Sequence, residues 1–164
     1  MTAARNPAGW VAVLTGAAGA IGAEIAVALD AAGARLALVD LNREALEKVQ
    51  DRLSRPAQLI VADLTRPEDI QRIRAEVIGH YGACHLLINN AGVVMVEAFE
   101  RSTPETIETE LRVNLLAPAL LSREFFPWLC LGFQSGRHTE RGQIVNIVSM
   151  ASIVPIAESA VYTC

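Results

Sequence analysis

WVAVLTGAAGAIG, residues 10–22, joins a continuous apolar run to a glycine-rich turn. An unbroken apolar run is typical of a strand that is buried on both faces of a sheet. Beyond the turn, Ile21, Ile25 and Leu29 recur every four residues, which predicts a helix with that stripe packed on the sheet. A strand, a tight turn and a helix in this order predict the first half of a βαβ unit.

The same alternation of apolar runs and helical segments continues along the chain. Further strands are predicted at residues 35–39, 58–61, 86–88 and 143–148. Helices are predicted at residues 43–53, from a capping box at 65–68 to about 80, from 102–105 past 114, and at 117–131, with the start of another at 160–164. This order predicts an α/β fold of the Rossmann type, a doubly wound parallel sheet with helices on both faces, truncated after its fifth strand.

Composition narrows the class of protein. The 164 residues are 52% apolar and 20% charged, which predicts a single domain, residues 1–164, with a real core. A net charge of -4 and scattered charges argue against a nucleic-acid or anionic-membrane partner. No apolar run is long enough to span a bilayer, and the first residues lack the core of a signal peptide. Three cysteines without CxxC spacing favour a reduced, cytoplasmic setting and no metal site.

The glycine-rich turn predicts a phosphate site. Unpaired N–H groups and the positive end of the helix dipole favour an anion such as a pyrophosphate. Asp40 ends the second predicted strand, where a carboxylate can accept hydrogen bonds from the ribose hydroxyls of a dinucleotide. Because that carboxylate would repel a 2′-phosphate, we expect NAD rather than NADP. The alternatives are a plain packing turn and an Asp40 that only caps the next helix.

Four features together resemble the short-chain dehydrogenase/reductase family over nearly the whole chain: TGAAGAIG at residues 15–22, NNAG at 89–92, and Ser149 and Tyr162 at the family spacing. Gly16 and Gly22 match the family motif TGxxxGxG, whereas Ala20 occupies the place of its middle glycine. The resemblance and the turn imply cofactor binding by Thr15, Gly16, Ala18, Gly19, Ala20, Ile21, Gly22, Asp40, Leu41, Ala62, Asp63, Leu64, Asn90, Ala91 and Gly92.

The same resemblance implies hydride transfer between the nicotinamide and an alcohol or carbonyl substrate. It implies that Asn114 holds a proton-relay water, that Ser149 orients the substrate oxygen and that Tyr162 moves the proton. Free tyrosine has a pKa of about 10, so the family uses a lysine four residues later, a position beyond Cys164. A complete family member is expected to form a homo-oligomer.

Two hypotheses therefore stand: part of an NAD-dependent oxidoreductase, or a catalytically incomplete nucleotide-binding fragment or interaction module. Lys48 is the only lysine, and we predict it on a surface helix, where it cannot replace the missing one. The fifth strand is expected at a sheet edge with apolar surface, so the isolated product should be poorly soluble or associate. His85 is interpreted as a surface variation. Glu97 and Glu100 could lie near the pocket loop, but a solvated loop is the preferred interpretation.

Overall fold

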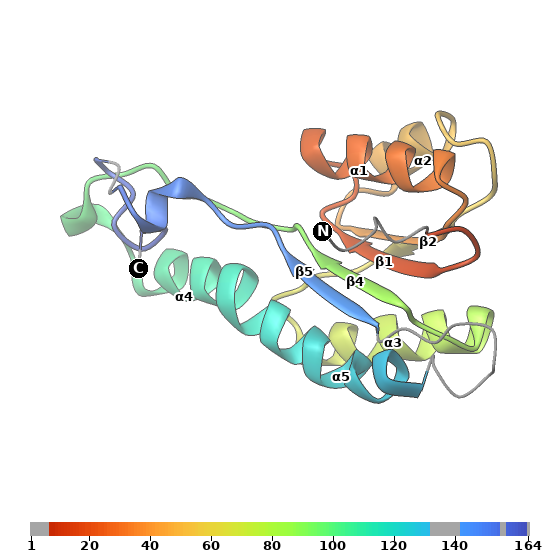
Figure 1. Ribbon diagram of the computed structural model, residues 1–164. Helices are drawn as coiled ribbons and strands as arrows, with labels where there is room; N and C mark the ends of the chain where they lie inside the picture. The colour runs from red at the N-terminus through yellow and green to blue at the C-terminus, as the bar shows by residue number, and fades with distance from the viewer. Residues whose placement is uncertain (1–6, 132–141, 155–156, 164) are drawn as a thin grey trace.

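The computed structural model describes residues 7–131, 142–154 and 157–163, with one parallel sheet at its centre (Figure 1). The strand order is β3-β2-β1-β4-β5. The strands are β1 (Val11–Thr15), β2 (Arg35–Asp40), β3 (Gln58–Val61), β4 (Leu86–Asn89) and β5 (Gln143–Asn146). The helices are α1 (Ala20–Ala31), α2 (Arg43–Gln50), α3 (Pro67–Tyr81), α4 (Pro104–Leu111) and α5 (Ala117–Leu131). Shorter turns are η1 (Phe99–Arg101), the π-helical η2 (Arg112–Leu116) and η3 (Met150–Ser152).

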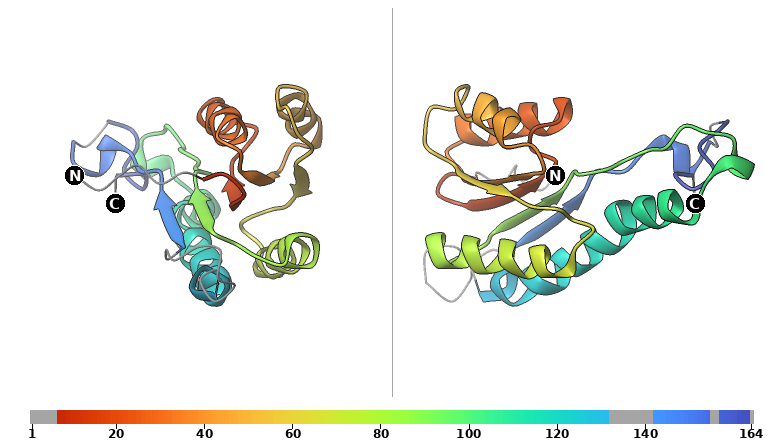
Figure 2. Two further views of the ribbon diagram at one scale, coloured as in Figure 1. Left: turned by 45° about the vertical axis from the view of Figure 1, so that its right-hand side comes forward. Right: turned by 180° about the vertical axis from the view of Figure 1, so that it is seen from behind.

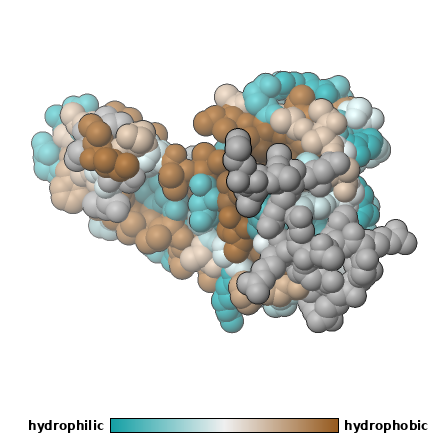
Figure 3. All heavy atoms as spheres, in the orientation of Figure 1, coloured by the Kyte–Doolittle hydropathy of each residue, from teal (hydrophilic) through white to brown (hydrophobic). Residues whose placement is uncertain are grey.

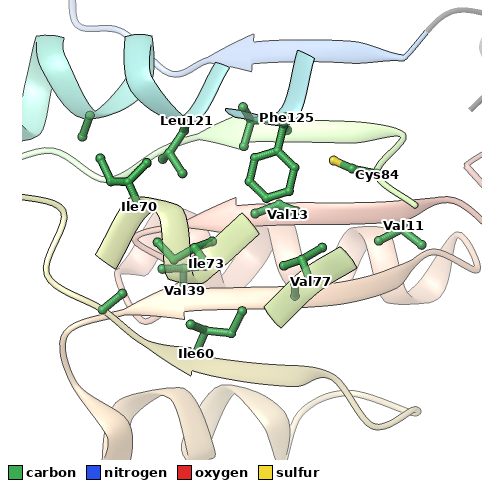
Figure 4. Packing of buried hydrophobic residues seen from close by; sticks show 14 of the residues in the cluster. Val11, Val13, Val39, Ile60, Ile70, Ile73, Val77, Cys84, Leu121 and Phe125 are labelled. Carbon is green, nitrogen blue, oxygen red and sulfur yellow. The ribbon is translucent and has the colours of Figure 1, made fainter. Parts of the chain in front are cut away.

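Helices cover both faces of the sheet, so the predicted doubly wound α/β fold is confirmed (Figure 2). On one face, Phe125 of α5 points towards Val13 of β1, and Ile73 of α3 packs beside Val39 of β2 (Figure 4). On the other face, α1 and α2 pack on a second buried cluster that includes Leu14 and Leu38. The central strand β1 is buried along its whole length, which explains its unbroken apolar sequence.

The chain adds strands first on one side of β1 and then on the other. β2 pairs with β1, and β3 pairs with β2. After α3 the chain crosses over, and β4 pairs with the opposite edge of β1. A crevice forms at such a switch point, outside the carboxyl ends of the strands.

The predicted apolar stripe of α1 is confirmed in part: Ile25 and Leu29 pack against the buried cluster, but Ile21 does not. Ile21 is 60% exposed, whereas Gly22, Ala23 and Ala26 are buried. The helix starts so close to the sheet that a Cβ at position 22 would lie 2.1 Å from the carbonyl oxygen of Gly16. Only small residues therefore fit on the buried face of its first turns.

The helix starts were predicted with mixed success. The capping box before α3 is wrong: Arg66 is the N-cap residue without a side-chain bond, and Pro67 opens the helix. Thr65 instead bonds Asp63, whose Oδ1 accepts from the backbone nitrogen and the hydroxyl of Thr65. The start of α4 is confirmed, with a capping box between Thr103 and Thr106. This helix ends sooner than predicted, because the π-helical turn η2 separates it from α5.

His85 is not a surface variation. Its side chain is half-buried, and its Nδ1 accepts a hydrogen bond of 3.0 Å from the backbone nitrogen of Val11. Its ring stacks on buried Trp10 with 6.3 Å between centroids. The imidazole thus satisfies the first N–H of the central strand, a role that no sequence pattern marks.

The carboxyl side of β5 is the least covered part of the sheet. β5 forms an edge, as predicted, and Ile144, Val145, Ile147 and Val148 are 39%, 37%, 41% and 83% exposed. Brown hydrophobic surface crosses the middle of the view in Figure 3. Residues 160–163 form turns in which the Thr163 nitrogen donates to the Ser159 oxygen at 3.1 Å, the bond of a single helical turn. Residues 132–141, Pro155 and Cys164 lie outside the described residues. Every helix in the described ranges is too short or too polar to cross a bilayer.

Candidate functional site

A cleft of about 870 Å³ opens at the carboxyl ends of β1, β2 and β4. This volume lies in the range of small-molecule sites, about 300–1,000 Å³. Every residue predicted to bind the cofactor lines it except Thr15. Sequence reasoning missed Val39, Asn42, Ala45, Thr65, Val93, Thr109 and Val113, which also line it. Several of these adjoin predicted positions, whereas nothing in the sequence pattern marks Thr109.

The glycine-rich turn closes against the segment that follows β4. Gly16 has a φ of +61°, and a Cβ there would lie 2.7 Å from the Cα of Ala91. Glycine is the residue that both takes this conformation and leaves this space. Gly19 is the N-cap of α1, without a side-chain cap, and the first turn of the helix holds no acidic residue. The amide groups of that turn suit an anion.

Thr15 and Asn90 bind the two segments together. The Thr15 hydroxyl accepts from the backbone nitrogens of Asn90 and Ala91, both at 3.1 Å. The Asn90 side-chain amide donates to the carbonyl oxygens of Thr15 at 3.1 Å and of Gly16 at 3.0 Å. Thr15 is only 1% exposed, so it shapes the turn from behind the cleft rather than lining it.

Asp40 reaches the glycine-rich turn directly. Its Oδ2 accepts a 3.0 Å hydrogen bond from the backbone nitrogen of Ala18, and its Oδ1 accepts one of 3.2 Å from Asn42. The carboxylate is half-buried and lines the cleft. The acid at the tip of β2 and the helix N-terminus beside β1 therefore face one cavity, as the sequence predicts.

Asn114 contacts the far end of the cleft through Val93. Its Oδ1 accepts from the Val93 nitrogen at 2.9 Å, and its Nδ2 donates to the Val93 oxygen at 2.7 Å. The residue lies in the π-helical turn η2, a feature that often marks functional sites. Its amide fixes the backbone of Val93, which lines the cleft and which we call the cleft floor.

Ser149 and Tyr162 lie on the carboxyl side of β5, and neither lines the cleft. The Ser149 hydroxyl caps η3 by accepting from the nitrogen of Ala151 at 3.1 Å. Tyr162 is half-buried in the turns of residues 160–163. Lys48 is exposed on α2, as predicted. The structure therefore joins the predicted cofactor residues but not the predicted Ser and Tyr.

Other reactive groups do not form a second centre in the described ranges. No group of three His, Cys, Asp or Glu side chains could hold a metal ion there. Burial raises the pKa of the Cys84 thiol to about 12, so it stays protonated at neutral pH. Cys84 therefore serves packing rather than nucleophilic chemistry.

Comparison with known proteins decides the family. The family model described as short chain dehydrogenase matches residues 10–164. The chain belongs to the short-chain dehydrogenase family. Among its relatives is an uncharacterized oxidoreductase of Bacillus subtilis, 32% identical over 155 residues, which cover 93% of this chain and 58% of the relative. The chain thus spans about three fifths of the length of the curated relatives it matches.

Solved structures of the family share this fold. A metagenomic short-chain oxidoreductase in complex with NADP is 34% identical with a TM-score of 0.88, and the match covers 97% of this chain and 71% of that one. A 3-ketoacyl-(acyl-carrier-protein) reductase from Brucella melitensis complexed with NADH is 25% identical with a TM-score of 0.86. That match covers 95% of this chain and 64% of the reductase. The two structures hold different nicotinamide cofactors.

Proposed function

We propose that residues 1–164 form the dinucleotide-binding domain of an NAD-dependent oxidoreductase that acts on an alcohol or carbonyl compound. The observation that carries the proposal is the contact between Asp40 and Ala18, which joins the acid of β2 to the glycine-rich turn. The amides at the start of α1 suit the pyrophosphate, and the Asp40 carboxylate suits the ribose hydroxyls.

Asp40 also favours NAD over NADP. A carboxylate beside the ribose repels a 2′-phosphate, and among the described residues that line the cleft none is Arg or Lys. The structural relatives include one complex with NADP and one with NADH, so the fold accommodates both cofactors. The choice between them then depends on the groups around the ribose; of the two acids that line the cleft, Asp40 and Asp63, Asp40 is the one bonded to the glycine-rich turn.

For the chemical step we carry over the family roles of Asn114, Ser149 and Tyr162. The nicotinamide supplies or accepts the hydride when it is bound. Ser149 would donate a hydrogen bond to the substrate oxygen, and Tyr162 would move the hydroxyl proton. Asn114 would support the proton relay beside the cleft floor, where its amide already holds Val93.

A second candidate function is dinucleotide binding without turnover. It is favoured by the position of Ser149 and Tyr162 outside the cleft and by the exposed position of Lys48. Hydride transfer, followed by the absorbance of reduced nicotinamide with a panel of alcohols and carbonyls, separates the two. Turnover that disappears in Tyr162→Phe supports the oxidoreductase, whereas NAD binding without any turnover supports the second candidate.

Calorimetry with NAD and NADP tests the binding proposal. In Asp40→Asn, which keeps the size of the side chain, NAD should bind about tenfold more weakly, because a charge-assisted hydrogen bond contributes about 1.5 kcal/mol or more. NADP binding should improve, since the repelling charge is gone. Asp51→Asn, an exposed change just after α2, is the matched control and should change neither affinity. Equal NAD affinity in Asp40→Asn and the wild type would refute the role of Asp40.

A further inference from the structure

One face of α4 and η2 is bonded along the extended segment that leaves β4. The bonded residues of the helix lie four positions apart, and their partners on the segment lie two positions apart. We call these three pairs the polar ladder: Asn114 with Val93, Glu110 with Met95, and Thr106 with Glu97. Figure 1 and both views in Figure 2 show β4 continuing as an extended strand-like segment on the side of α4.

The spacing of the bonded residues along the helix matches the spacing of their partners along the segment. Four residues of an α-helix rise about 6 Å, and two residues of an extended chain advance about 6.6 Å. Residues four apart share one helix face, and alternate residues of an extended chain point to one side. A helix with polar side chains at 106, 110 and 114 can therefore hold the segment at three successive points.

Glu110 is the central contact of the polar ladder. It is only 3% exposed, and its Oε1 accepts a 2.6 Å hydrogen bond from the backbone nitrogen of Met95. A buried carboxylate reduces stability unless it is bonded, and the Met95 N–H supplies that bond. The contribution of this carboxylate is therefore the fixed position of the Met95 backbone.

The Thr106 contact is weaker. Its hydroxyl has one proton and lies closer to the Thr103 oxygen, at 2.9 Å, than to Glu97 Oε1, at 3.3 Å. Glu97 is nonetheless half-buried and bonded, so its interpretation as part of a solvated loop is wrong. The pairs Glu110–Met95 and Asn114–Val93 thus hold the segment more firmly than the pair Thr106–Glu97.

The two ends of the polar ladder reach different functional regions. At one end Val93 lines the cleft. At the other, the Glu97 nitrogen donates a 2.8 Å hydrogen bond to the oxygen of Glu158, a residue with a φ of +59°. A non-glycine residue keeps that conformation only where its surroundings hold it. Glu158 lies in the turn that precedes Tyr162.

We propose that Glu110 is a positioning residue: by fixing Met95, it sets the path of residues 93–97 and links the cleft floor to the segment that carries Tyr162. Its expected effect on cofactor affinity rests on the proposed function above. The link itself is a property of the protein without ligand, so it can be tested separately.

Amide hydrogen exchange of Glu110→Leu, Glu110→Gln and the control Glu108→Gln tests the link. In Glu110→Leu, exchange should rise about tenfold at Met95, the factor that the loss of about 1.4 kcal/mol produces, and about threefold or more at Val93 and Glu97. Glu110→Gln retains an acceptor oxygen and should restore most of the protection. Glu108→Gln, a charge loss on the exposed side of the same helix, should change none of the three amides.

Global stability separates positioning from folding. Glu110→Leu leaves the Met95 N–H without its partner but also removes a buried carboxylate, so its free energy of unfolding should fall by no more than about 1–3 kcal/mol. Faster exchange confined to Met95, with Val93 and Glu97 unchanged, would overturn the proposal. If the Leu variant does not fold, Glu110→Met serves instead: faster exchange at Met95, Val93 and Glu97 supports the proposal, and unchanged exchange at Val93 and Glu97 contradicts it.

NAD calorimetry supplies the functional arm. Affinity should fall about three- to tenfold in Glu110→Leu and less than about twofold in Glu110→Gln, since the amide oxygen still holds Met95. A wild type that binds no NAD would refute the proposed function, while the exchange data would still decide the positioning role. Accelerated exchange in Glu110→Leu together with unchanged NAD affinity would overturn the link to the cleft.

Discussion

The carboxyl ends of β1 and β5 lie in one sheet but are held by different kinds of contact. After β1, the turn at Gly16 contacts the side-chain amide of Asn90 and the backbone of Ala91, more than 70 positions away, with no space for a side chain at Gly16. After β5, the described residues 147–154 carry exposed apolar side chains, and the later turn at Glu158 is tied back through its bond with Glu97. The first region is specified by contacts between distant parts of the described chain, whereas the second depends on few of them.

Gly22→Ala should have the largest effect on stability, because it adds a methyl group to the tightly packed turn. Its Cβ would lie 2.1 Å from the Gly16 oxygen and 2.9 Å from the Cα of Ala17. We expect a loss of about 3 kcal/mol in the free energy of unfolding and no measurable NAD binding. Denaturant unfolding and calorimetry measure the two.

Gly79→Ala is the control for that experiment. Gly79 lies in α3, and a Cβ added at this position would have nothing within 4 Å, so alanine should stabilise the protein by about 0.5–1 kcal/mol. Equal effects of the two substitutions would show that the turn is not packed as described.

Asp30→Asn should have the second-largest effect on stability, and the size of this effect depends on pH. Buried Asp30 accepts from the nitrogen and hydroxyl of Ser54 and from Arg55, and the Ser54 hydroxyl is the main cause of a pKa below the usual 3.8. Because the pKa is lowered in the folded state, the stabilisation is present above pH 3.8 and is lost as the pH falls below it.

The variant should lose about 2 kcal/mol at pH 7, and its stability should fall less than that of the wild type between pH 5 and about pH 3. Thermal unfolding across this range measures the difference. Parallel pH curves for both proteins would mean that Asp30 does not contribute its charge to the fold.

Glu158→Gly should have the smallest effect. Glycine relieves the strain of a φ of +59° but adds freedom to the unfolded chain, and these terms nearly cancel. We expect a change below about 0.5 kcal/mol in global unfolding. A loss above about 1 kcal/mol in denaturant unfolding would show that the C-terminal segment belongs to the main cooperative unit.

The sequence predicts well those features that follow from strand ends. Parallel strands bring their carboxyl ends to one edge of the sheet. The sequence alone therefore places Asp40, Gly16 and Asn90 around one cleft. It also predicts α4 from its capping box, because capping is a local interaction. These predictions need only the order of the elements and the chemistry of a few residues.

Features that depend on the distance between elements could not be predicted in this way. The buried face of α1 contains Gly22, Ala23 and Ala26 instead of the larger Ile21, because the closeness of the helix to the sheet decides which side chains fit. His85 accepts from Val11 across two strands, and Glu110 binds Met95 across a loop. Periodicity does not reveal such partners. The roles of Ser149 and Tyr162 remain predictions.

The switch of strand growth from one side of β1 to the other has a consequence for folding during synthesis. β1 meets β2 soon after both leave the ribosome, but it must wait for some seventy residues before β4 can dock on its other edge. Until then the central strand has one unpaired side, and pairing across so long a loop is slow. A dinucleotide would therefore bind only after that late docking, and by mass action it would favour chains that have completed it.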